Sequence, residues 1–288
     1  MTCHAPLAID DLRGACAAAR FGGAIHYFES TDSTNTVAQR LARDGAAEGT
    51  VVIAETQTKG RGRLGRTWIS PPFRNLYLSI VLRPAIAIPA APRLGLVVGL
   101  ATAETVAEWV PRAALKWPND VLIDGRKVAG ILMEMDADDD RVRSVIAGVG
   151  VNLNMTLDDI PPELRDKAVS LSAAVGAPID RVVFATRLLA RLQERYDQCL
   201  AHGFASLRPL WDRLSCLQGR SVEIDDGGRR YGGVVWGMAD DGTLRLRDPA
   251  GHDISIVAGE VTVVDGYPGE SRQRSAISDQ LKNKKERS

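Results

Sequence analysis

The sequence has no excess of charge of either sign and few cysteines, histidines or aromatic residues. Lysine plus arginine and aspartate plus glutamate both number 36 among 288 residues, which argues against a protein whose main partner is duplex nucleic acid. None of the four cysteines forms a C-x-x-C pair or stands beside a histidine at metal-ligand spacing, so no structural metal site is expected. The count permits a disulfide between distant cysteines, but reduced thiols are the preferred interpretation. The histidines His4, His26, His202 and His252 lack nearby partners for a Ser-His-Asp arrangement.

A long uninterrupted apolar run is also missing. The N-terminal 20 residues contain the acidic pair Asp10-Asp11, which excludes a signal peptide. Two glutamates interrupt the apolar stretch Leu94–Val110, which is too short and too charged to span a bilayer. We therefore predict a soluble, cytoplasmic protein that does not contact membranes.

Hydrophobic periodicity predicts both helices and strands between residues 25 and 214. Helices are expected from Ser33 or Thr34 to Asp44, over Leu94–Trp109, from the N-cap Asp180 to Ala201, and over Phe204–Leu214. A tight hairpin is expected at Asp124-Gly125. The expected strands are Ile25–Phe28, Thr50–Ala54, Asn75–Leu82, Ala114–Trp117, Val121–Ile123, Val128–Met135 and Val142–Val151.

The texture changes near Leu217, where short strands separated by Asp-Gly and Gly-Gly turns begin. We predict a small all-β barrel over residues 217–266 that docks on the main domain 25–214. Residues 1–24 should form a short N-terminal segment with one helix, and the polar tail 267–288 should be disordered. The basic end of that tail could touch nucleic acid, but a solvated tail is favoured. The five expected barrel strands are Ser221–Ile224, Tyr231–Trp236, Thr243–Arg247, Ile254–Ile256 and Val261–Val264.

A glycine- and arginine-rich loop, Gly60-Arg61-Gly62-Arg63-Leu64-Gly65-Arg66-Thr67-Trp68, interrupts the periodic pattern. Glycines let a ligand approach the backbone closely, and arginines supply bidentate donors for phosphate. The loop lacks the Lys-Ser/Thr ending of a Walker A motif, and its arginines fill the face that a Rossmann loop keeps small. By itself the loop supports a phosphate-binding site and a nucleic-acid-binding loop about equally.

A second motif, Lys116-Trp117-Pro118-Asn119-Asp120, follows an expected strand. The proline forces an extended exit that can direct Asn119 and Asp120 into a cleft, although Asn-Asp after proline also makes good turns. The Asp124-Gly125 hairpin would fold Lys127 back beside Asp120. That pair is either an exposed ion pair of little consequence or a cation that awaits a carboxylate at the end of an apolar groove.

Two further polar clusters complete the candidate site. Ser33-Thr34-Asn35 offers two hydroxyls and an amide at a helix start, where capping accounts for one of them. Gln57, beside the glycine loop, would equally pass as a surface residue. Gly148-Val149-Gly150-Val151-Asn152 ends a strand with glycines, which often mark close approach of a backbone or ligand.

In this order the motifs resemble the catalytic domain of biotin protein ligases. The resemblance covers roughly Ile25 to Asn154, extends more loosely to the C-terminal module, and is specific because several ordered motifs match. It implies an α+β fold, a mixed β-sheet packed with helices as in class II synthetases, plus a C-terminal SH3-like domain. Bifunctional members carry an N-terminal DNA-binding domain. About 30 residues precede Ser33, so the chain resembles the ligase-only type. The matching stretches are Asp32–Asn35, Glu55–Gln57 with Gly60–Arg63, Arg66–Trp68, Asn75–Ser79, Lys116–Asp120, Lys127–Leu132 and Gly148–Asn152.

The resemblance implies ATP-dependent activation of biotin to biotinyl-5'-AMP, with Mg²⁺, and transfer to a lysine of a biotin carboxyl carrier domain, as in acetyl-CoA carboxylase. Lys127 would hold the biotin carboxylate, Asp120 would orient or deprotonate the acceptor lysine, and Arg63 and Lys116 would neutralise phosphate. Trp68 would cover the adenylate, and Asn152 would contact adenine or metal. A homodimer is left open. The implied biotin contacts are Ser33, Thr34, Asn35, Gln57, Arg61, Gly62, Arg63 and Lys127, and the implied nucleotide contacts are Arg61, Arg63, Arg66, Trp68, Lys116, Asn119 and Asn152.

Three alternatives remain at this point. A lipoate or octanoate protein ligase shares the fold and the acyl-carrier chemistry, but the Gly-Arg-Gly-Arg loop and the Lys-Trp-Pro-Asn-Asp motif favour biotin. A nucleic-acid-binding regulator would use the arginine loop and the basic tail. A non-enzymatic biotin-binding module would need neither Lys116 nor Arg61.

Overall fold

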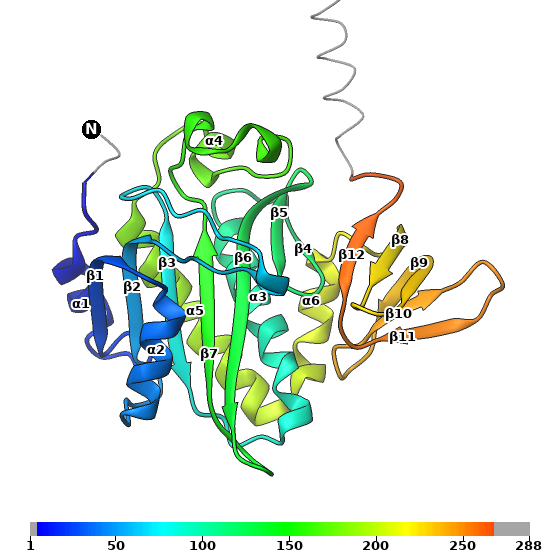
Figure 1. The fold of residues 1–288 in the computed structure, drawn as a ribbon, viewed down its shortest axis with the longest axis horizontal. Coiled ribbons are helices and arrows are strands. Elements are labelled where there is room, and N and C mark those ends of the chain that lie inside the picture. Colours follow the sequence, from blue (N-terminus) through cyan, green and yellow to red (C-terminus); the bar gives the residue numbers. More distant parts are fainter. Residues whose placement is uncertain (1–4, 268–288) are drawn as a thin grey trace, which may run out of the picture.

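The computed structural model describes residues 5–267, and its centre is a seven-stranded mixed sheet with strand order β1-β2-β3-β7-β6-β5-β4 (Figure 1). β1 and β2 run parallel and are joined by α2 (Thr34–Arg43), whereas every other neighbouring pair is antiparallel. The predicted mixed sheet is therefore confirmed. The strands are β1 Ile25–Thr31, β2 Val51–Gln57, β3 Leu76–Leu82, β4 Ala113–Lys116, β5 Asp120–Ile123, β6 Arg126–Ala137 and β7 Val142–Val151.

Helices cover both faces of this sheet. On one face α2 packs its small residues Ala38 and Ala42 against Val52, Val81 and Ile146. On the other face lie α3 (Pro92–Ala107) and α5 (Arg181–His202), with α1 (Ile9–Cys16) against α5 and α6 (Arg208–Leu214) beside β4 (Figure 1). The large apolar core lies between the sheet and helices α3 and α5. The polar motifs open on the other face of the sheet, the face that carries α2.

Helix α3 differs from its prediction in its bounds and its burial. It starts two residues earlier than expected because Pro92 occupies the first turn, where proline's fixed φ suits a helix and its missing N–H is not needed. It is buried on nearly all sides, since the sheet lies against one side and α5 against another. It ends at Ala107, two residues before the predicted end at Trp109.

The hairpin between β5 and β6 confirms the predicted Asp124-Gly125 turn. Ile123 pairs with Arg126, and the two turn residues have φ of 49° and 78°, as a tight two-residue turn requires. β6 is longer than predicted at both ends. After β7 comes an irregular segment with the short helix α4 (Leu171–Val175), for which the sequence predicted no regular structure.

The C-terminal part forms a separate five-stranded antiparallel sheet, in the order β11-β10-β9-β8-β12. It docks on the main domain through Trp117, which is 2% exposed and donates its indole N–H to the carbonyl of Gly242 at 3.1 Å. The strands are β8 Ser221–Asp225, β9 Arg230–Met238, β10 Leu244–Arg247, β11 Asp253–Ile256 and β12 Glu260–Val263.

The predicted boundary of the tail needs one correction. Tyr267, which was assigned to the disordered tail, packs against Gly125 and places its ring 5.9 Å from Lys116 Nζ. The remainder of the predicted tail, 268–288, lies outside the described residues, as does Cys3. Cys16, Cys199 and Cys216 are free thiols. Within residues 5–267 no helix has the length and apolar character that crossing a bilayer demands.

Candidate functional site

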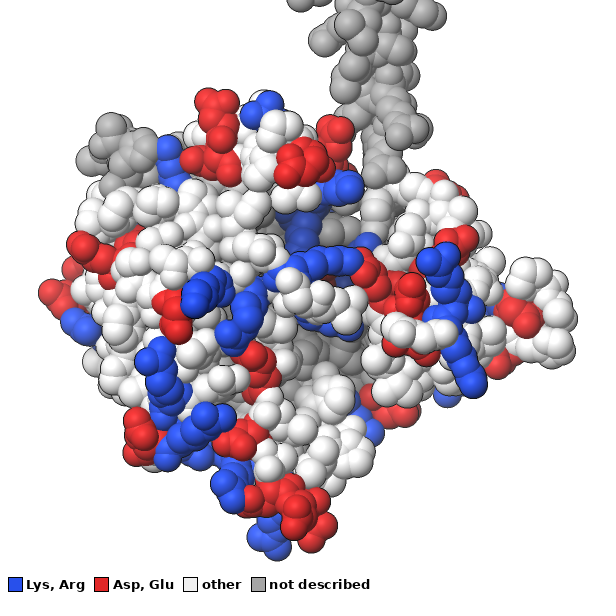
Figure 2. Space-filling model, in the orientation of Figure 1, with Lys and Arg blue, Asp and Glu red and all other residues white. Residues whose placement is uncertain are grey.

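Two adjoining pockets open between the glycine loop and the β5–β6 hairpin, and the larger one also reaches the C-terminal sheet. The larger has a volume of about 440 Å³ and the smaller about 50 Å³. Both are lined by Gly62, Arg63, Trp68, Asn119 and Lys127. The predicted convergence of the glycine loop and the Lys127 strand is therefore confirmed. Figure 2 shows a hollow near the middle of this face, with basic side chains along its rim and acidic ones beside them.

The smaller pocket is lined by polar groups from α2, β2 and β3. Gln57 Oε1 accepts hydrogen bonds from the backbone N–H of Thr34 at 2.9 Å and from its hydroxyl at 3.1 Å. Ser33 is the N-cap residue by position, but its side chain makes no capping bond. Gln57 takes over that capping role, and it lines the pocket, which argues against the alternative that it is only a surface residue.

Asn35 sits at the base of the smaller pocket, 4% exposed, and its amide is fully engaged. It accepts a hydrogen bond from the hydroxyl of Ser79 at 2.6 Å and donates to Glu134 Oε2 at 2.6 Å. A Cβ on Gly148 would lie 2.2 Å from Asn35 Oδ1. Glycine is therefore required at 148 by the close approach of this amide.

Arg61 lines the smaller pocket but directs its guanidinium toward β6 and α2. Its Nη2 donates to both carboxylate oxygens of Glu134, at 2.9 and 2.8 Å, and its Nη1 donates to the hydroxyl of Thr36. Arg61 does not line the larger pocket, where Lys116 and Arg66 lie. The structure thus places Arg61 apart from Lys116 and Arg66, two of the other residues that were predicted to contact the nucleotide.

Trp68 forms a wall shared by the two pockets. A Cβ on Gly150 would lie 2.6 Å from its indole ring, and one on Gly130 would lie 2.9 Å from it. The absence of side chains at these two strand positions leaves the space that the indole fills. Its Nε1 is buried and has no hydrogen-bond partner within residues 5–267, although such a donor is costly to leave unsatisfied.

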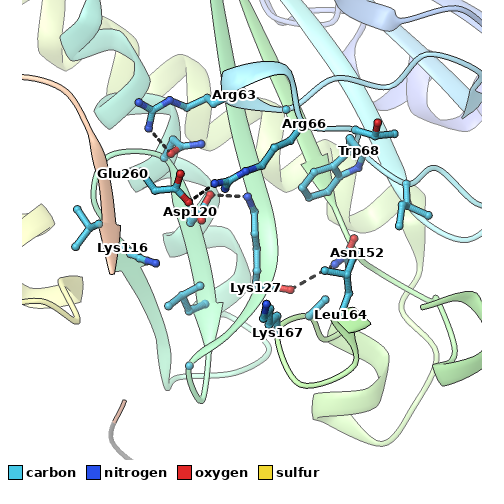
Figure 3. Close-up of a pocket in the computed structure, with 18 of the residues that line it drawn as sticks. Arg63, Arg66, Trp68, Lys116, Asp120, Lys127, Asn152, Leu164, Lys167 and Glu260 are labelled. Carbon is cyan, nitrogen blue, oxygen red and sulfur yellow. Dashed lines mark hydrogen bonds and ion pairs between the residues drawn. The ribbon is translucent and has the colours of Figure 1, made fainter. Parts of the chain in front are cut away.

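Lys127 lies at the junction of the two pockets. Its Nζ is 2.6 Å from Asp120 Oδ1 and 5.3 Å from the centre of the Trp68 ring (Figure 3). Its backbone pairs with the irregular segment after β7, donating to the carbonyl of Lys167 at 2.7 Å and accepting from the N–H of Val169 at 3.0 Å. The predicted proximity of Lys127 to Asp120 is confirmed, and the pair is only partly exposed.

Asn152 joins two segments at the edge of the larger pocket. It is 5% exposed, and its amide donates to the carbonyls of Lys127 at 3.4 Å and Val169 at 3.3 Å. These bonds tie the segment after β7 to the Lys127 strand. Contact with adenine or metal therefore stays a prediction.

The larger pocket gathers cations from distant parts of the chain. Lys116 comes from β4, while Arg63 and Arg66 come from the glycine loop (Figure 3). Burial lowers the pKa of Lys116, with Asp120 opposing that shift. Arg63 donates to Asn119 Oδ1 at 2.9 Å, and Asn119 donates in turn to the carbonyl of Ile131. A ligand with several negative charges would meet these three cations here and also Lys127 and Lys167, which line the same pocket.

Comparison with known proteins identifies the family. The biotin/lipoate A/B protein ligase family model matches residues 27–152. The bifunctional ligase/repressor BirA of Bacillus subtilis is 38% identical over 226 residues, which span 78% of this chain and 70% of BirA. The biotin–[acetyl-CoA-carboxylase] ligase of Paracoccus denitrificans is 36% identical over 80% of this chain and 97% of its own length. This chain belongs to the biotin protein ligase family.

Its fold is also similar to that of a solved family member. The biotin protein ligase from Aquifex aeolicus, in complex with biotin and ATP, matches with a TM-score of 0.72 at 30% identity. The match covers 83% of this chain and 97% of the Aquifex chain. The predicted family and fold class are therefore confirmed.

Several pocket residues were missed by the sequence analysis. Glu134, Lys167, Glu260 and Tyr267 all touch or line the pockets, and only Glu134 falls within the 27–152 region. Lys167 lies in a segment without periodicity, and Glu260 begins a strand of another sheet. No local pattern marks them, because only chain folding brings them to the site.

Proposed function

We propose that this protein activates biotin with ATP to biotinyl-5'-AMP and transfers the biotinyl group to a lysine of a biotin carboxyl carrier domain. Family membership supports this reaction. One observation supports its assignment to particular residues: the arginine-glycine loop and Lys127 line two connected pockets. A small polar pocket beside a larger cationic one suits a urea-headed acid joined to a nucleotide.

The smaller pocket is the proposed ureido site. Ser33, Thr34 and Gln57 present hydroxyl and amide groups there, with the backbone near Gly62 beside them. A site built to satisfy a buried urea rejects acids that lack it, because its own polar groups would be left without partners. Asn35 stabilises this arrangement indirectly, because its amide oxygen accepts a hydrogen bond from the Ser79 hydroxyl, which also contacts the Thr34 hydroxyl.

The larger pocket is the proposed nucleotide site. Lys127, at the junction, would hold the biotin carboxylate and bring it to the α-phosphate, where a P–O bond to biotin forms and pyrophosphate leaves. Lys116, Arg63 and Arg66 would offset the charge that develops on the phosphate oxygens. The buried indole N–H of Trp68 would find a partner in a ligand acceptor at this wall.

Mg²⁺ is proposed to enter with ATP. This cation prefers oxygen ligands and is usually bound through one or two carboxylates together with the phosphates of the nucleotide. Asp120 and Asp166 supply carboxylate oxygens in the larger pocket, so the donor set fits. When bound, Mg²⁺ would offset phosphate charge and help pyrophosphate to leave.

A direct experiment tests the whole proposal. The full chain is incubated with biotin, MgATP and a biotin carboxyl carrier domain, and the carrier is weighed by mass spectrometry. We expect the mass to rise by one biotinyl group, only when ATP is present. Replacing biotin by lipoate in the same mixture tests the related activity, and labelling with lipoate in preference to biotin would contradict the proposal. Sedimentation of the same samples, with and without ligands, distinguishes a monomer from a homodimer.

Asp120 is proposed to orient or deprotonate the acceptor lysine in the second step. Asp120→Asn, supplied with preformed biotinyl-AMP, is expected to transfer biotin to the carrier about 10²-fold more slowly, as expected for loss of a positioned proton acceptor. Starting from the adenylate removes any effect of the substitution on Lys127 in the first step. Asp124→Asn is the matched control, because Asp124 lies in the turn of the same hairpin and asparagine tolerates its left-handed backbone. Unimpaired transfer by Asp120→Asn would exclude this role.

Arg63 is proposed to retain the adenylate. Arg63→Gly removes a guanidinium that lines both pockets, and we expect biotinyl-AMP to escape roughly 10- to 100-fold faster, the equivalent of about 1.5–3 kcal/mol. The measurements are adenylate release and labelling of unrelated lysines. Leu64→Gly is the control for loop flexibility, because Leu64 is 71% exposed and already has a φ of 54°. Equal release by both variants would show that charge is not what holds the adenylate.

A further inference from the structure

One ion pair links the glycine loop to the C-terminal sheet across 194 residues of sequence. Arg66 Nη2 donates to Glu260 Oε1, and Glu260 is the first residue of β12. Beside it, Arg63 Nη2 donates to the carbonyl of Gly259 at 3.4 Å. The start of β12 therefore contacts two arginines of the loop, of which Arg66 is drawn beside Glu260 in Figure 3.

Glu260 lines the larger pocket together with Lys116, Arg63 and Arg66, which are among the cations that would meet the phosphates. The Arg66 hydrogen bond lowers the pKa of Glu260, and the charges of Arg66, Lys116 and Arg63 act in the same direction. A permanent negative charge thus stands among the cations of the phosphate site.

We propose that Glu260 is a resident counter-anion of the phosphate site: its carboxylate holds Arg66 in the ligand-free protein and must release it when nucleotide phosphates bind. This inference rests on the proposed function, since it assumes that the larger pocket receives a polyphosphate.

The chemistry of the two anions explains why they would compete. Carboxylate and phosphate oxygens make the same charge-assisted hydrogen bonds to a guanidinium. A polyphosphate carries more negative charge than one carboxylate, so it attracts Arg66 more strongly and repels Glu260. The side chains of Arg66 and Glu260 are 63% and 39% exposed, and such accessible pairs are weak enough to exchange.

Two consequences follow for the free protein. The charge of Arg66 is not left without a counter-charge, and the glycine loop is held against the C-terminal sheet. Nucleotide binding then breaks one contact between loop and sheet, so part of the binding energy is used to separate them. Glu260 therefore weakens nucleotide binding while it holds the empty site together.

The test is Glu260→Gln in the full chain, measured by biotin-dependent ATP–pyrophosphate exchange. We expect the KM for MgATP to fall about 2- to 5-fold, the range of one exposed ion pair, and the difference to shrink as salt rises. Glu260→Ala should act in the same direction. Glu223→Gln is the matched control, because Glu223 pairs with β12 opposite Thr262, is exposed, and does not line the pocket; its KM should not change.

A second readout separates this inference from the proposed function. Calorimetry with inorganic tripolyphosphate measures the affinity of the phosphate site without biotin or catalysis, and Glu260→Gln should bind it about 2- to 5-fold more tightly. When Arg66 is replaced by Gln as well, the gain in tripolyphosphate affinity should become smaller, because this double variant lacks the arginine that the loss of Glu260 would release. A wild-type protein without exchange activity would contradict the proposed function, while the calorimetry would still decide the role of Glu260.

Two results would overturn the inference. Unchanged affinity in Glu260→Gln, by both measurements, would mean that the carboxylate does not compete with phosphate. Weaker MgATP binding, or a raised Mg²⁺ requirement, would mean that Glu260 contributes to the nucleotide complex as a ligand.

Discussion

Replacing Lys127 by glutamine is expected to lower the rate of biotin adenylation about 10²- to 10³-fold, the usual loss when one preorganised group that stabilises developing charge is removed. Lys127 Nζ is the cation at the junction of the two pockets, and it lies 2.6 Å from Asp120 in the free protein. Glutamine keeps much of the side-chain length but not the charge. The measurement is biotin-dependent ATP–pyrophosphate exchange, with KM for biotin and kcat determined separately.

Lys59→Gln is the matched control for this substitution. Lys59 lies at the start of the same glycine loop but is exposed and lines neither pocket. We expect its exchange rate to stay close to that of the wild type. Thermal unfolding of Lys127→Gln should change little, because the ion pair with Asp120 is partly exposed. Exchange activity within threefold of the wild type would remove Lys127 from the mechanism.

Replacing Arg181 by methionine is expected to reduce the free energy of unfolding by about 3–5 kcal/mol, because it leaves a buried carboxylate without its cation. Glu55 is 1% exposed, and Arg181 contacts both of its oxygens, at 2.6 and 3.2 Å. The hydroxyl of Tyr27 and the backbone N–H of Leu7 also donate to Glu55. This cluster joins α5, β2 and the N-terminal segment, so its loss should be global and measurable by urea unfolding.

An exposed arginine–carboxylate pair provides the comparison. Arg112 contacts both oxygens of Asp124 at 2.9 and 2.8 Å, but the two side chains are 55% and 31% exposed. Arg112→Met should therefore cost less than about 1 kcal/mol. The double variant Arg181→Met with Glu55→Gln should recover part of the lost stability, since the buried charge is then absent. Equal destabilisation by Arg181→Met and Arg112→Met would refute the argument from burial.

Elements with strong local signals could be predicted from the sequence. The Asp124-Gly125 turn requires two residues that tolerate positive φ, and it sets Lys127 opposite Leu122, from where the lysine side chain reaches Asp120. The strand β3 was predicted to within one residue of its observed bounds, and all seven of its residues are buried. Where the local signal was absent, as between β7 and α5, the prediction was empty.

Side-chain direction could not be predicted, because competing partners decide it after folding. Arg61 and Arg63 are two residues apart in one loop, yet the first binds Glu134 and the second Asn119. Ser33 has the residue type of a capping side chain, but Gln57, 23 residues beyond Thr34, supplies the bond to Thr34. Each choice depends on which partner lies within hydrogen-bond distance.

By itself, then, the order of motifs along this chain determined the family, the mixed sheet and most of the residues that line the two pockets. Tertiary structure alone decided that Lys167, Glu260 and Tyr267 join them, that Trp68 fills the space over Gly130 and Gly150, and that Asn152 ties a loop to the Lys127 strand. The physical reason is one of range. Turn and strand preferences act between neighbouring residues, whereas charge pairing and close packing act between whatever residues the fold brings together.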